Sequence, residues 1–205
     1  MKTKDQLINL MINYKSENYP LYRTRSAIGS VKAGSLYDLI KRHSDIEGEV
    51  AEVGVWRGGS AIMLADLLPN KDVFIFDTFE GLPYNHKQDN HHVKNDFNDV
   101  DYNEVKETLL AWPNIKIYKG IFPDENSEVI ADKKFSIVHI DTDMYKAYLD
   151  CFEFFYDKMT VGGIILLDDY NEPTCQGATI ATHEFLEDKP EIVESLGTQY
   201  YIIKK

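Results

Sequence analysis

The stretch "EVAEVGVWRGGSAIMLADLL" (residues 49–68) decides the fold, because a strand pattern changes into a helix pattern within it. Its first part, "EVAEVGV", is a valine-rich run of strand length, and its last part, "GGSAIMLADLL", is typical of a helix. Glycines at the junction allow a tight turn and a close approach of the backbone to a neighbour. A strand that turns directly into a helix indicates one unit of an alternating α/β fold.

The same alternation continues to the end of the chain. Further runs of strand length follow at residues 72–77, 114–120, 135–141 and 162–168. Helical patterns occupy 144–156 and 177–188, and the tail "EIVESLGTQYYIIKK" is typical of two strands around a Gly-Thr turn. Buried strands that alternate with helices form a parallel sheet through right-handed crossovers. The sequence therefore predicts a mostly parallel sheet with helices on both faces and a C-terminal antiparallel hairpin.

The length and composition are those of an ordinary globular protein. Of the 205 residues, 43% are hydrophobic and 12% are aromatic, so we expect one domain over residues 1–205. Its first part, residues 1–45, is expected to be a helical segment. Within the helix at 144–156, the aromatic residues Phe152, Phe154, Phe155 and Tyr156 are expected to belong to the core.

Charge and hydropathy exclude some partners. A net charge of −12 argues against nucleic acid or an anionic membrane as the main partner, because phosphate contacts need clustered lysine and arginine. No apolar run approaches the roughly 20 residues that span a bilayer, and the N-terminus does not resemble a signal peptide. The two cysteines, Cys151 and Cys175, do not suggest a disulfide framework. We therefore expect a cytoplasmic protein, and the sequence leaves open whether it is a homo-oligomer.

Aspartates end several of the predicted strands. Asp141 ends one apolar run, and Asp168 and Asp169 end the run "GGIILLDD" side by side. Strand ends converge at the carboxyl edge of a parallel sheet, and crowded carboxylates need a positive partner. Oxygen ligands select Mg²⁺ or a similar ion, so we expect these three residues to hold a metal. The alternative is that Asp168 faces the crevice while Asp169 caps the next turn without a metal; Asp143 is expected to cap the following helix.

The glycine-rich turn at "EVGVWRGGS" predicts a ligand site at the first strand's end. Trp56 stands where a dinucleotide fingerprint would need glycine, which argues against that cofactor. The spacing of Glu52, Gly54 and Gly58 instead resembles the first motif of class I methyltransferases, whose loop wraps the amino-acid part of S-adenosylmethionine. Asp77 ends the second strand, where an acid can accept hydrogen bonds from ribose hydroxyls. The alternatives are glycines that serve turn packing only and an aspartate that serves a turn.

Together these motifs resemble the macrocin O-methyltransferase family. The matching stretches are "EVGVWRGGSA", "FDTFEGLP", "IYKGIFPD", "HIDTDMY" and "GGIILLDDYN", and the similarity runs from about residue 24 to the C-terminus. Members of this family have the Rossmann-like class I methyltransferase fold and methylate sugar hydroxyls in antibiotic biosynthesis, with S-adenosylmethionine and Mg²⁺. The resemblance thus implies a small-molecule hydroxyl acceptor. Because this chain looks shorter at its N-terminus than the antibiotic enzymes, the identity of the acceptor is not inherited.

The resemblance also implies roles for individual residues. It places at the cofactor Glu52, Gly54, Gly58, Ser60, Asp77 and Gly120. It places Asp141, Asp168 and Asp169 at the metal, and it makes Asp141 the general base as well. Such a base takes the proton of the acceptor hydroxyl during methyl transfer.

The segment 81–103 is a candidate lid over this site. It is polar, rich in Asn, Asp and His, and long for a connection, so we expect it to be mobile without acceptor and ordered with it. His91 and His92 either contact the acceptor or metal or are solvated. His139 is expected to be a hydrogen-bonded core histidine, and "YRTRS" (22–26) either guards the entrance or forms a solvated turn.

Two other classes of function compete with methyl transfer. A metal-dependent hydrolase or phosphoryl-transfer enzyme could use the same three aspartates, although the chain has no GxxxxGK[ST] loop and its crevice is acidic. A non-catalytic protein could bind S-adenosylmethionine on the same scaffold, although it would have no need of a metal.

Overall fold

The computed structural model describes residues 2–14 and 25–205, and within them the chain forms a seven-stranded sheet. The strand order is β3-β2-β1-β4-β5-β7-β6. The parallel strands are β1 (Glu49–Val53), β2 (Val73–Asp77), β3 (Ile115–Lys119), β4 (Phe135–Ile140) and β5 (Met159–Leu167). The hairpin of β6 (Glu194–Leu196) and β7 (Gln199–Ile203) adds to β5 through an antiparallel pairing with β7. The predicted sheet and the predicted C-terminal hairpin are confirmed.

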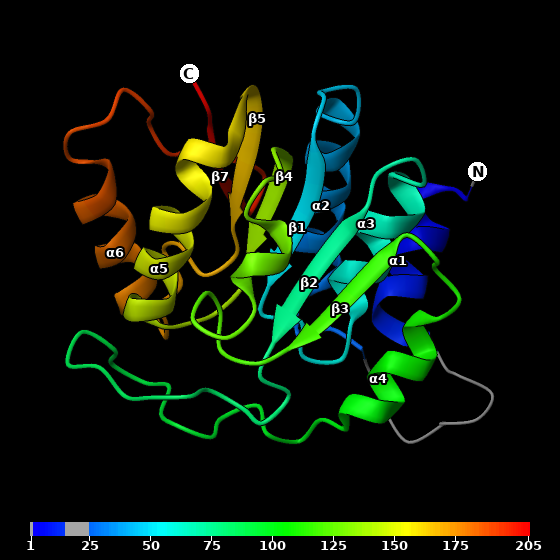
Figure 1. Cartoon of the computed structure of the whole chain (residues 1–205), viewed down its shortest axis with the longest axis horizontal. Helices are drawn as coiled ribbons and strands as arrows, with labels where there is room; N and C mark the ends of the chain where they lie inside the picture. The colour runs from blue at the N-terminus through cyan, green and yellow to red at the C-terminus, as the bar shows by residue number, and fades with distance from the viewer. Residues whose placement is uncertain (1, 15–24) are drawn as a thin grey trace.

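Helices cover both faces of this sheet (Figure 1). The helices are α1 (Lys4–Asn13), α2 (Ser30–Arg42), α3 (Gly59–Leu67), α4 (Tyr102–Leu109), α5 (Tyr145–Phe155) and α6 (Gln176–Leu186), with short 3-10 turns η1 (Ser127–Ile130) and η2 (Tyr156–Lys158). Residues of α1, α2, α3 and α4 pack together in one apolar cluster, and residues of α5 and α6 pack in the other. The sheet, whose strand ends contain the predicted site residues, therefore lies between two packed layers of helices.

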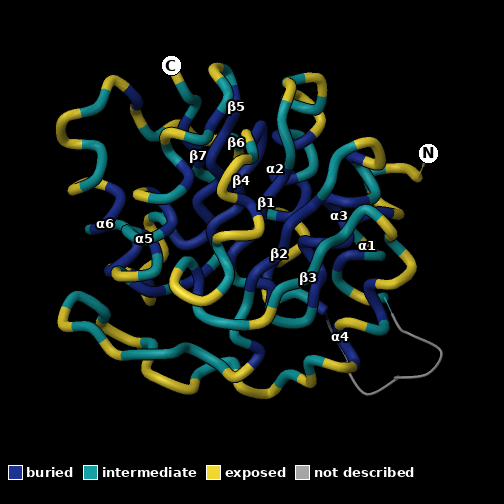
Figure 2. Tube along the Cα trace, in the orientation of Figure 1, coloured by how far each residue is buried: buried dark blue, intermediate teal, exposed yellow. Residues whose placement is uncertain are grey.

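The alternation of side chains along the strands explains the two layers. In β1, Val50 joins the cluster with α2 and α3, whereas its neighbour Ala51 joins the cluster with α5 and α6. Successive strand residues point to opposite faces, so a strand that is buried on both faces carries apolar residues throughout. Figure 2 shows the central strands buried along their length. In α5, Phe152 and Phe155 are fully buried, as the aromatic pattern predicts, while Phe154 packs against them from the edge of the cluster.

A long connection crosses the carboxyl ends of the strands. Residues 78–101 contain neither helix nor strand, and in Figure 1 they run beneath the strand ends and α5. This connection contains most of the predicted lid segment, 81–103, whose last two residues begin α4. The segment therefore lies over the edge of the sheet at which the aspartates gather.

At two loops the structure differs from what the sequence predicts: the solvated-turn alternative is wrong for Arg25, and the predicted cap at Asp143 is wrong. Residues 22–24 of "YRTRS" lie outside the described residues, but Arg25 is buried rather than solvated, because its guanidinium pairs with Glu104, whose side chain is 1% exposed. Asp143 does not cap α5, because its backbone is left-handed (φ 60°) and Met144 occupies the cap position. Both side chains are instead directed to partners far away in the sequence.

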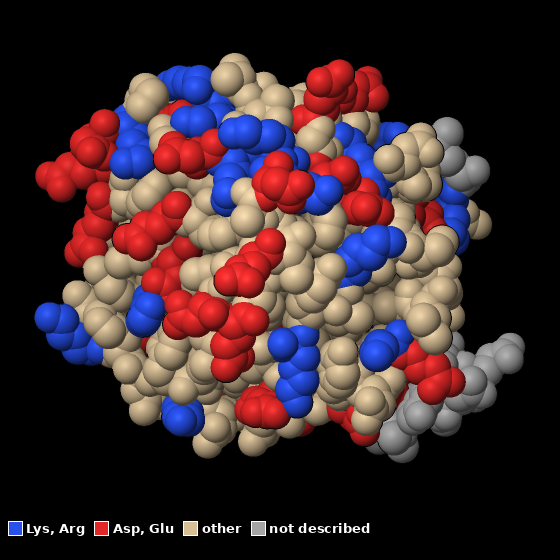
Figure 3. All heavy atoms as spheres, viewed as in Figure 1, with Lys and Arg blue, Asp and Glu red and all other residues tan. Residues whose placement is uncertain are grey.

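Two further features concern the distribution of surface charge and the lengths of the helices. On the face drawn in Figure 3, acidic side chains are interspersed with lysine and arginine. Within residues 2–14 and 25–205, every helix is too short or too polar to cross a membrane.

Candidate active site

A cavity of about 400 Å³ opens at the carboxyl edge of the sheet. The predicted site residues that line it are Gly54, Ser60, Asp77, Gly120, Asp141, Asp168 and Asp169. Among the described residues that line the cavity, Glu52 and Gly58 are missing. Seven of the nine predicted site residues therefore line one cavity, and Glu52 and Gly58 do not.

Backbone geometry requires a glycine at position 54 and favours one at position 58. Gly54 has φ 87°, and a Cβ there would lie 1.7 Å from the carbonyl oxygen of Asp141. Gly58 has φ 84° at the N-cap of α3, and a Cβ there would meet the Leu109 side chain at 3.2 Å. Positive φ and contacts this close favour glycine. Gly54 thus lets β1 pass directly beside the end of β4, whereas Gly58 shapes the start of α3.

Asp77 fixes the loop between β1 and α3. Its Oδ2 accepts hydrogen bonds from the backbone N–H groups of Val55 (2.7 Å) and Trp56 (2.8 Å). Its Oδ1 accepts a hydrogen bond from the Phe79 N–H at 2.6 Å. The carboxylate also lines the cavity. The turn role and a ligand role are therefore compatible, since each carboxylate oxygen can accept more than one hydrogen bond.

The segment before α2 forms another wall of the cavity. Residues 25–29 line it, and the backbone carbonyl of Arg25 accepts a hydrogen bond from the Gly59 N–H at 3.1 Å. The buried Arg25 guanidinium donates to Glu104 on α4 and, through Nε, to the Tyr14 carbonyl at 2.8 Å. Arg25 thereby ties α1, α3 and α4 to this wall, a role that a cationic stretch in the sequence does not reveal.

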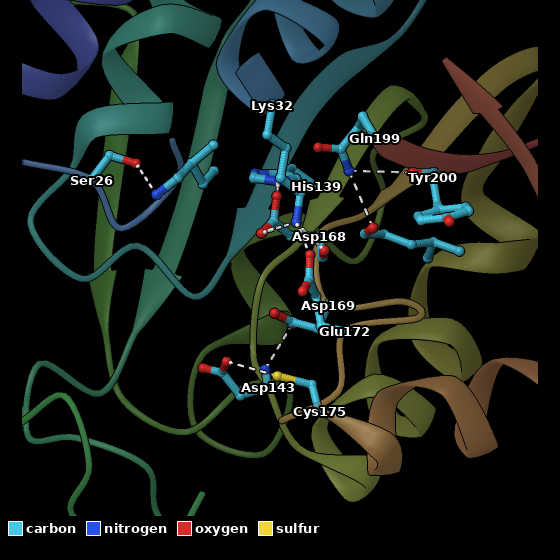
Figure 4. A network of polar contacts seen from close by, with 12 residues as sticks. Ser26, Lys32, His139, Asp143, Asp168, Asp169, Glu172, Cys175, Gln199 and Tyr200 are labelled. Carbon is cyan, nitrogen blue, oxygen red and sulfur yellow. Dashed lines mark hydrogen bonds and ion pairs between the residues drawn. The ribbon is translucent and has the colours of Figure 1, made fainter. Parts of the chain in front are cut away.

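Lys32 is a site residue that sequence reasoning missed. Its Nζ lies 2.9 Å from Oδ2 of Asp168, also donates to the Asp168 carbonyl, and lies 3.4 Å from Glu172 (Figure 4). Burial opposes charge on Lys32, but the Asp168 carboxylate outweighs it and raises the pKa of Lys32. Burial would raise the pKa of Asp168, yet His139 and Lys32 hold that pKa below its usual value. The carboxylate of Asp168 therefore lies between a lysine and a histidine that both favour its charged form.

Glu52 belongs to a buried polar row beneath the cavity. It lies opposite His139 in the pairing of β1 with β4, and its Oε1 is 2.8 Å from Nδ1 of His139. The other ring nitrogen of His139 is 3.5 Å from Oδ1 of Asp168. Burial opposes charge on His139, but Asp168 and Glu52 raise its pKa well above the usual value. The expected core histidine is confirmed, and it connects Glu52 to the acidic end of the cavity.

Burial and neighbouring negative charges raise the pKa values of the Asp141 and Asp169 carboxyl groups. Burial and the charges of Asp168 and Asp169 raise the pKa of Asp141 well above its usual value. Burial and the charges of Asp143 and Asp168 do the same to the pKa of Asp169. Oδ2 of Asp169 accepts a hydrogen bond from the Asp143 N–H at 2.8 Å. A cation bound beside these two carboxyl groups would favour their charged forms and lower both pKa values.

The donor set at this end fits a hard divalent ion. One ligand atom each of His139, Asp141 and Asp168 lies within 4.8 Å of the others, whereas Asp169 is outside this compact group. Oδ1 of Asp168 is buried, and apart from the 3.5 Å contact with Nε2 of His139 it has no hydrogen-bond partner among the described residues. Crowded carboxylate oxygens with an unsatisfied atom are the donors that Mg²⁺ prefers. Two of the three predicted ligands thus converge, and the third is engaged by the backbone of Asp143.

The connection over the cavity is fastened to both helices of the α5–α6 layer. Oδ1 of Asp89 accepts a hydrogen bond from the first N–H of α5, at Tyr145 (2.9 Å). Oδ1 of Asn90 accepts one from the first N–H of α6, at Gln176 (3.2 Å). Neither helix has a capping side chain at its own N-cap among the described residues. The connection therefore supplies caps that these two helices lack.

The other end of the connection is held at the glycine-rich turn. Asp99 accepts hydrogen bonds from Trp56 Nε1 (2.9 Å) and Arg57 Nη2 (2.6 Å). Between the two fastenings, His92 lines the cavity, whereas its neighbour His91 is exposed. The two histidines that the sequence left undecided thus have different surroundings.

The fold is that of class I methyltransferases, as predicted. Two solved structures match 98% of this chain at 19% identity: the O-methyltransferase NovP, with a TM-score of 0.80 over 98% of its length, and the calicheamicin methyltransferase CalS11, with a TM-score of 0.74 over 90% of its length.

The sequence comparison shows the family. The family described as macrocin-O-methyltransferase (TylF) matches residues 14–197, and the chain therefore belongs to it. Mycinamicin III 3''-O-methyltransferase of Micromonospora griseorubida is 27% identical over 87% of this chain and 77% of its own length. Demethyldecarbamoylnovobiocin O-methyltransferase of Streptomyces niveus is 28% identical over 66% of this chain and 58% of its own length. The resemblance read from the motifs is confirmed, and the chain is an O-methyltransferase.

Proposed function

We propose that this protein transfers the methyl group of S-adenosylmethionine to a hydroxyl of a sugar or glycosylated small molecule, with the help of a divalent ion. The observation that carries the proposal is one cavity with two chemically different ends. Gly54 and the loop held by Asp77 line one part of the cavity, here called the glycine end, and the carboxylates of Asp141 and Asp168 line the part called the acidic end. A donor and an acceptor bound in the same cavity can be brought to reacting distance.

The glycine end is proposed to bind the methyl donor. Asp77 would accept hydrogen bonds from the ribose hydroxyls, and the N-terminus of α3, at Ser60, would face the carboxylate of the donor because helix N-termini attract anions. Gly120 lines the cavity beside them. Glu52 does not line the cavity, so we propose that it positions His139 rather than touching the donor. Gly58 is proposed to act through the shape of the turn.

The acidic end is proposed to bind and activate the acceptor. Asp141 takes the proton of the acceptor hydroxyl as the oxygen attacks the methyl carbon and the carbon–sulfur bond of the donor breaks. Asp141 is proposed for this task because its carboxylate lines the cavity beside Asp168, within reach of an acceptor bound there. Asp141 and Asp168, with Asp169 beside them, would hold Mg²⁺, which would supply positive charge that lowers the pKa of the hydroxyl. Lys32 and His139 lower the pKa of Asp168 and so favour its charged form.

Residues 81–103 are proposed to cover the acceptor and exclude water. Leu82, Tyr84 and His92 from this segment line the cavity. Water exclusion strengthens the electrostatic interactions within a site and prevents side reactions. Hydrogen bonds of Asp89, Asn90 and Asp99 hold the cover in place. Exchange of the acceptor would therefore involve breaking at least some of these hydrogen bonds.

The acceptor class is inferred from the relatives. The mycinamicin relative is named as a 3''-O-methyltransferase, and a further relative from Streptomyces olivaceus, 26% identical over 65% of this chain and 57% of its own length, is named for a dimethoxy-rhamnosyl substrate. We therefore propose a hydroxyl on a sugar ring as the methyl acceptor. Family membership favours this function over a hydrolase or a pure binder built on the same carboxylates.

A methyl-transfer assay tests the proposal. The protein is incubated with methyl-labelled S-adenosylmethionine, Mg²⁺ and a panel of demethylated glycosides and nucleotide-linked 6-deoxysugars, and products are detected by mass spectrometry. We expect one labelled methyl ether on a sugar of at least one acceptor and none with Asp141→Asn. Absence of S-adenosylmethionine binding in a calorimetric titration of the wild-type protein would overturn the proposal whatever the acceptor.

A further inference from the structure

We propose that His92, Asp143 and Cys175 form a second metal site, which takes a thiophilic divalent ion such as Zn²⁺ and joins the cover segment to the rim of the cavity. These residues come from three separate parts of the chain: the segment 81–103, the turn between β4 and α5, and the residue before α6. The site is distinct from the oxygen donors at Asp141 and Asp168.

The distances within this group suit a tetrahedral ion. One ligand atom of each residue lies within 4.8 Å of the others. Oδ1 of Asp143 is 3.7 Å from Nε2 of His92 and 3.4 Å from Sγ of Cys175. Zinc binds nitrogen and oxygen at about 2.0–2.2 Å and thiolate sulfur at about 2.3 Å, which places neighbouring tetrahedral ligands roughly 3.3–3.8 Å apart. The separations of Asp143 from His92 and from Cys175 fall in that range, and the ligand atoms of His92 and Cys175 lie within 4.8 Å of one another.

The second ring nitrogen of His92 is held as in known metal sites. Its Nδ1 lies 3.3 Å from Oδ2 of Asp96, which leaves Nε2 directed at Asp143. Histidine ligands usually donate their other N–H to a carboxylate, which fixes the tautomer and the ring orientation. Asp96 is therefore the outer partner of the proposed site.

The backbone of Asp143 directs its carboxylate to this group. Its φ of 60° is uncommon for a residue with a side chain, and its N–H is fixed by the carboxylate of Asp169 at 2.8 Å. Figure 4 shows Asp143 and Cys175 pointing toward one another, and the thiol donates to the carboxylate. The backbone conformation and the thiol contact therefore both direct the Asp143 carboxylate towards Cys175.

The donor types separate this site from the Mg²⁺ site. A nitrogen, an oxygen and a sulfur ligand select zinc or cobalt, whereas carboxylates alone select magnesium. All three residues line the cavity, so a fourth ligand position would face the acceptor space. Binding replaces the thiol proton by the ion and releases that proton. If the proposed methyl transfer holds, an ion here would keep the cover closed, and Zn²⁺ would inhibit where Mg²⁺ supports turnover.

Titration with Co²⁺ alone tests the site without methyl donor or acceptor. Thiolate bound to Co²⁺ gives an intense charge-transfer absorption in the near ultraviolet, so the spectrum reports the sulfur ligand directly. We expect this band in the wild-type protein and its loss in Cys175→Ser. The band should be retained in the control Cys151→Ser, because Cys151 is a core residue on the buried face of α5. A wild-type protein without the band, or Cys175→Ser that keeps it, overturns the proposal.

Two further variants keep the test open if Cys175→Ser fails to fold. His92→Gln should weaken Co²⁺ binding more than Asp96→Asn, which should weaken it about 10–100-fold as outer partners do. His91→Gln is the matched control, because His91 is the exposed neighbour of His92. Equal Co²⁺ affinity in His92→Gln and His91→Gln overturns the proposed ligand set. Because the probe is Co²⁺ alone, failure of methyl transfer would leave this result unaffected.

Discussion

The two ends of the cavity are built from different parts of the polypeptide. At the glycine end, backbone groups form the surface: Gly54 passes beside β4, and Asp77 holds the N–H groups of the following loop. At the acidic end, side chains from distant segments meet: Lys32 and His139 reach Asp168 from α2 and β4. The first end is therefore sensitive to the shape of the chain and the second to its charge.

The largest expected effect follows from adding one carbon at the glycine end. Gly54→Ala would place a Cβ 1.7 Å from the Asp141 carbonyl oxygen at a positive φ, so we expect a loss of about 3 kcal/mol or more in the free energy of unfolding. Gly29→Ala is the matched control, because a Cβ there meets no described atom within 4 Å. Denaturant unfolding compares the two variants. Similar stabilities would mean that the shape of this end is not critical.

A charge change at the acidic end should cost nearly as much. Lys32→Met leaves the buried Asp168 carboxylate without its ammonium partner, and breaking such a pair costs about 3 kcal/mol. Lys4→Met removes an ion pair with Asp38 whose side chains are 38% and 42% exposed, so it should cost less than about 1 kcal/mol. Urea unfolding in chelator measures both. Added Mg²⁺ should restore part of the loss in Lys32→Met only; equal losses in the two variants would remove Lys32 from the account.

A smaller effect is expected at the cover that spans both ends. Asp89→Ala removes a cap from α5, which should lower stability by about 1 kcal/mol and speed hydrogen exchange in residues 81–103. Gly177→Ala should loosen the same segment, because its Cβ would lie 2.0 Å from Oδ1 of Asp89. The exposed Lys87→Ala serves as the control. Exchange that stays as slow in both variants as in Lys87→Ala would show that this contact does not hold the cover.

The glycine end could be predicted from the sequence because its geometry is local. Gly54 and Gly58 lie in one turn, and the aspartates follow apolar runs whose ends must meet at one edge of a parallel sheet. The same reasoning located Asp141 and Asp168 at the cavity. Strand patterns also located the hairpin, since the alternation on both sides of Gly197 is local too.

The buried ion pairs could not be predicted, because their two partners are far apart in the sequence. Lys32 is 136 residues from Asp168, and Arg25 is 79 residues from Glu104. The sequence around Lys32 and around Arg25 looks the same as the sequence around a solvent-exposed lysine or arginine. The prediction that Asp143 caps α5 failed for a related reason: a left-handed backbone turns its carboxylate away from the helix, and Asp89 takes the place of the cap from 56 residues away.

The central claim is that one end of the cavity binds S-adenosylmethionine and the other a divalent ion. Paired titrations of Asp77→Ala and Asp168→Asn test it most directly, with S-adenosylmethionine followed by calorimetry and Mn²⁺, a paramagnetic substitute for Mg²⁺, followed by electron paramagnetic resonance. Asp77→Ala should weaken S-adenosylmethionine binding about tenfold to a hundredfold and leave Mn²⁺ binding intact. Asp168→Asn should do the reverse. Unchanged S-adenosylmethionine affinity in Asp77→Ala, or unchanged Mn²⁺ affinity in Asp168→Asn, would contradict the division of the cavity into these two ends.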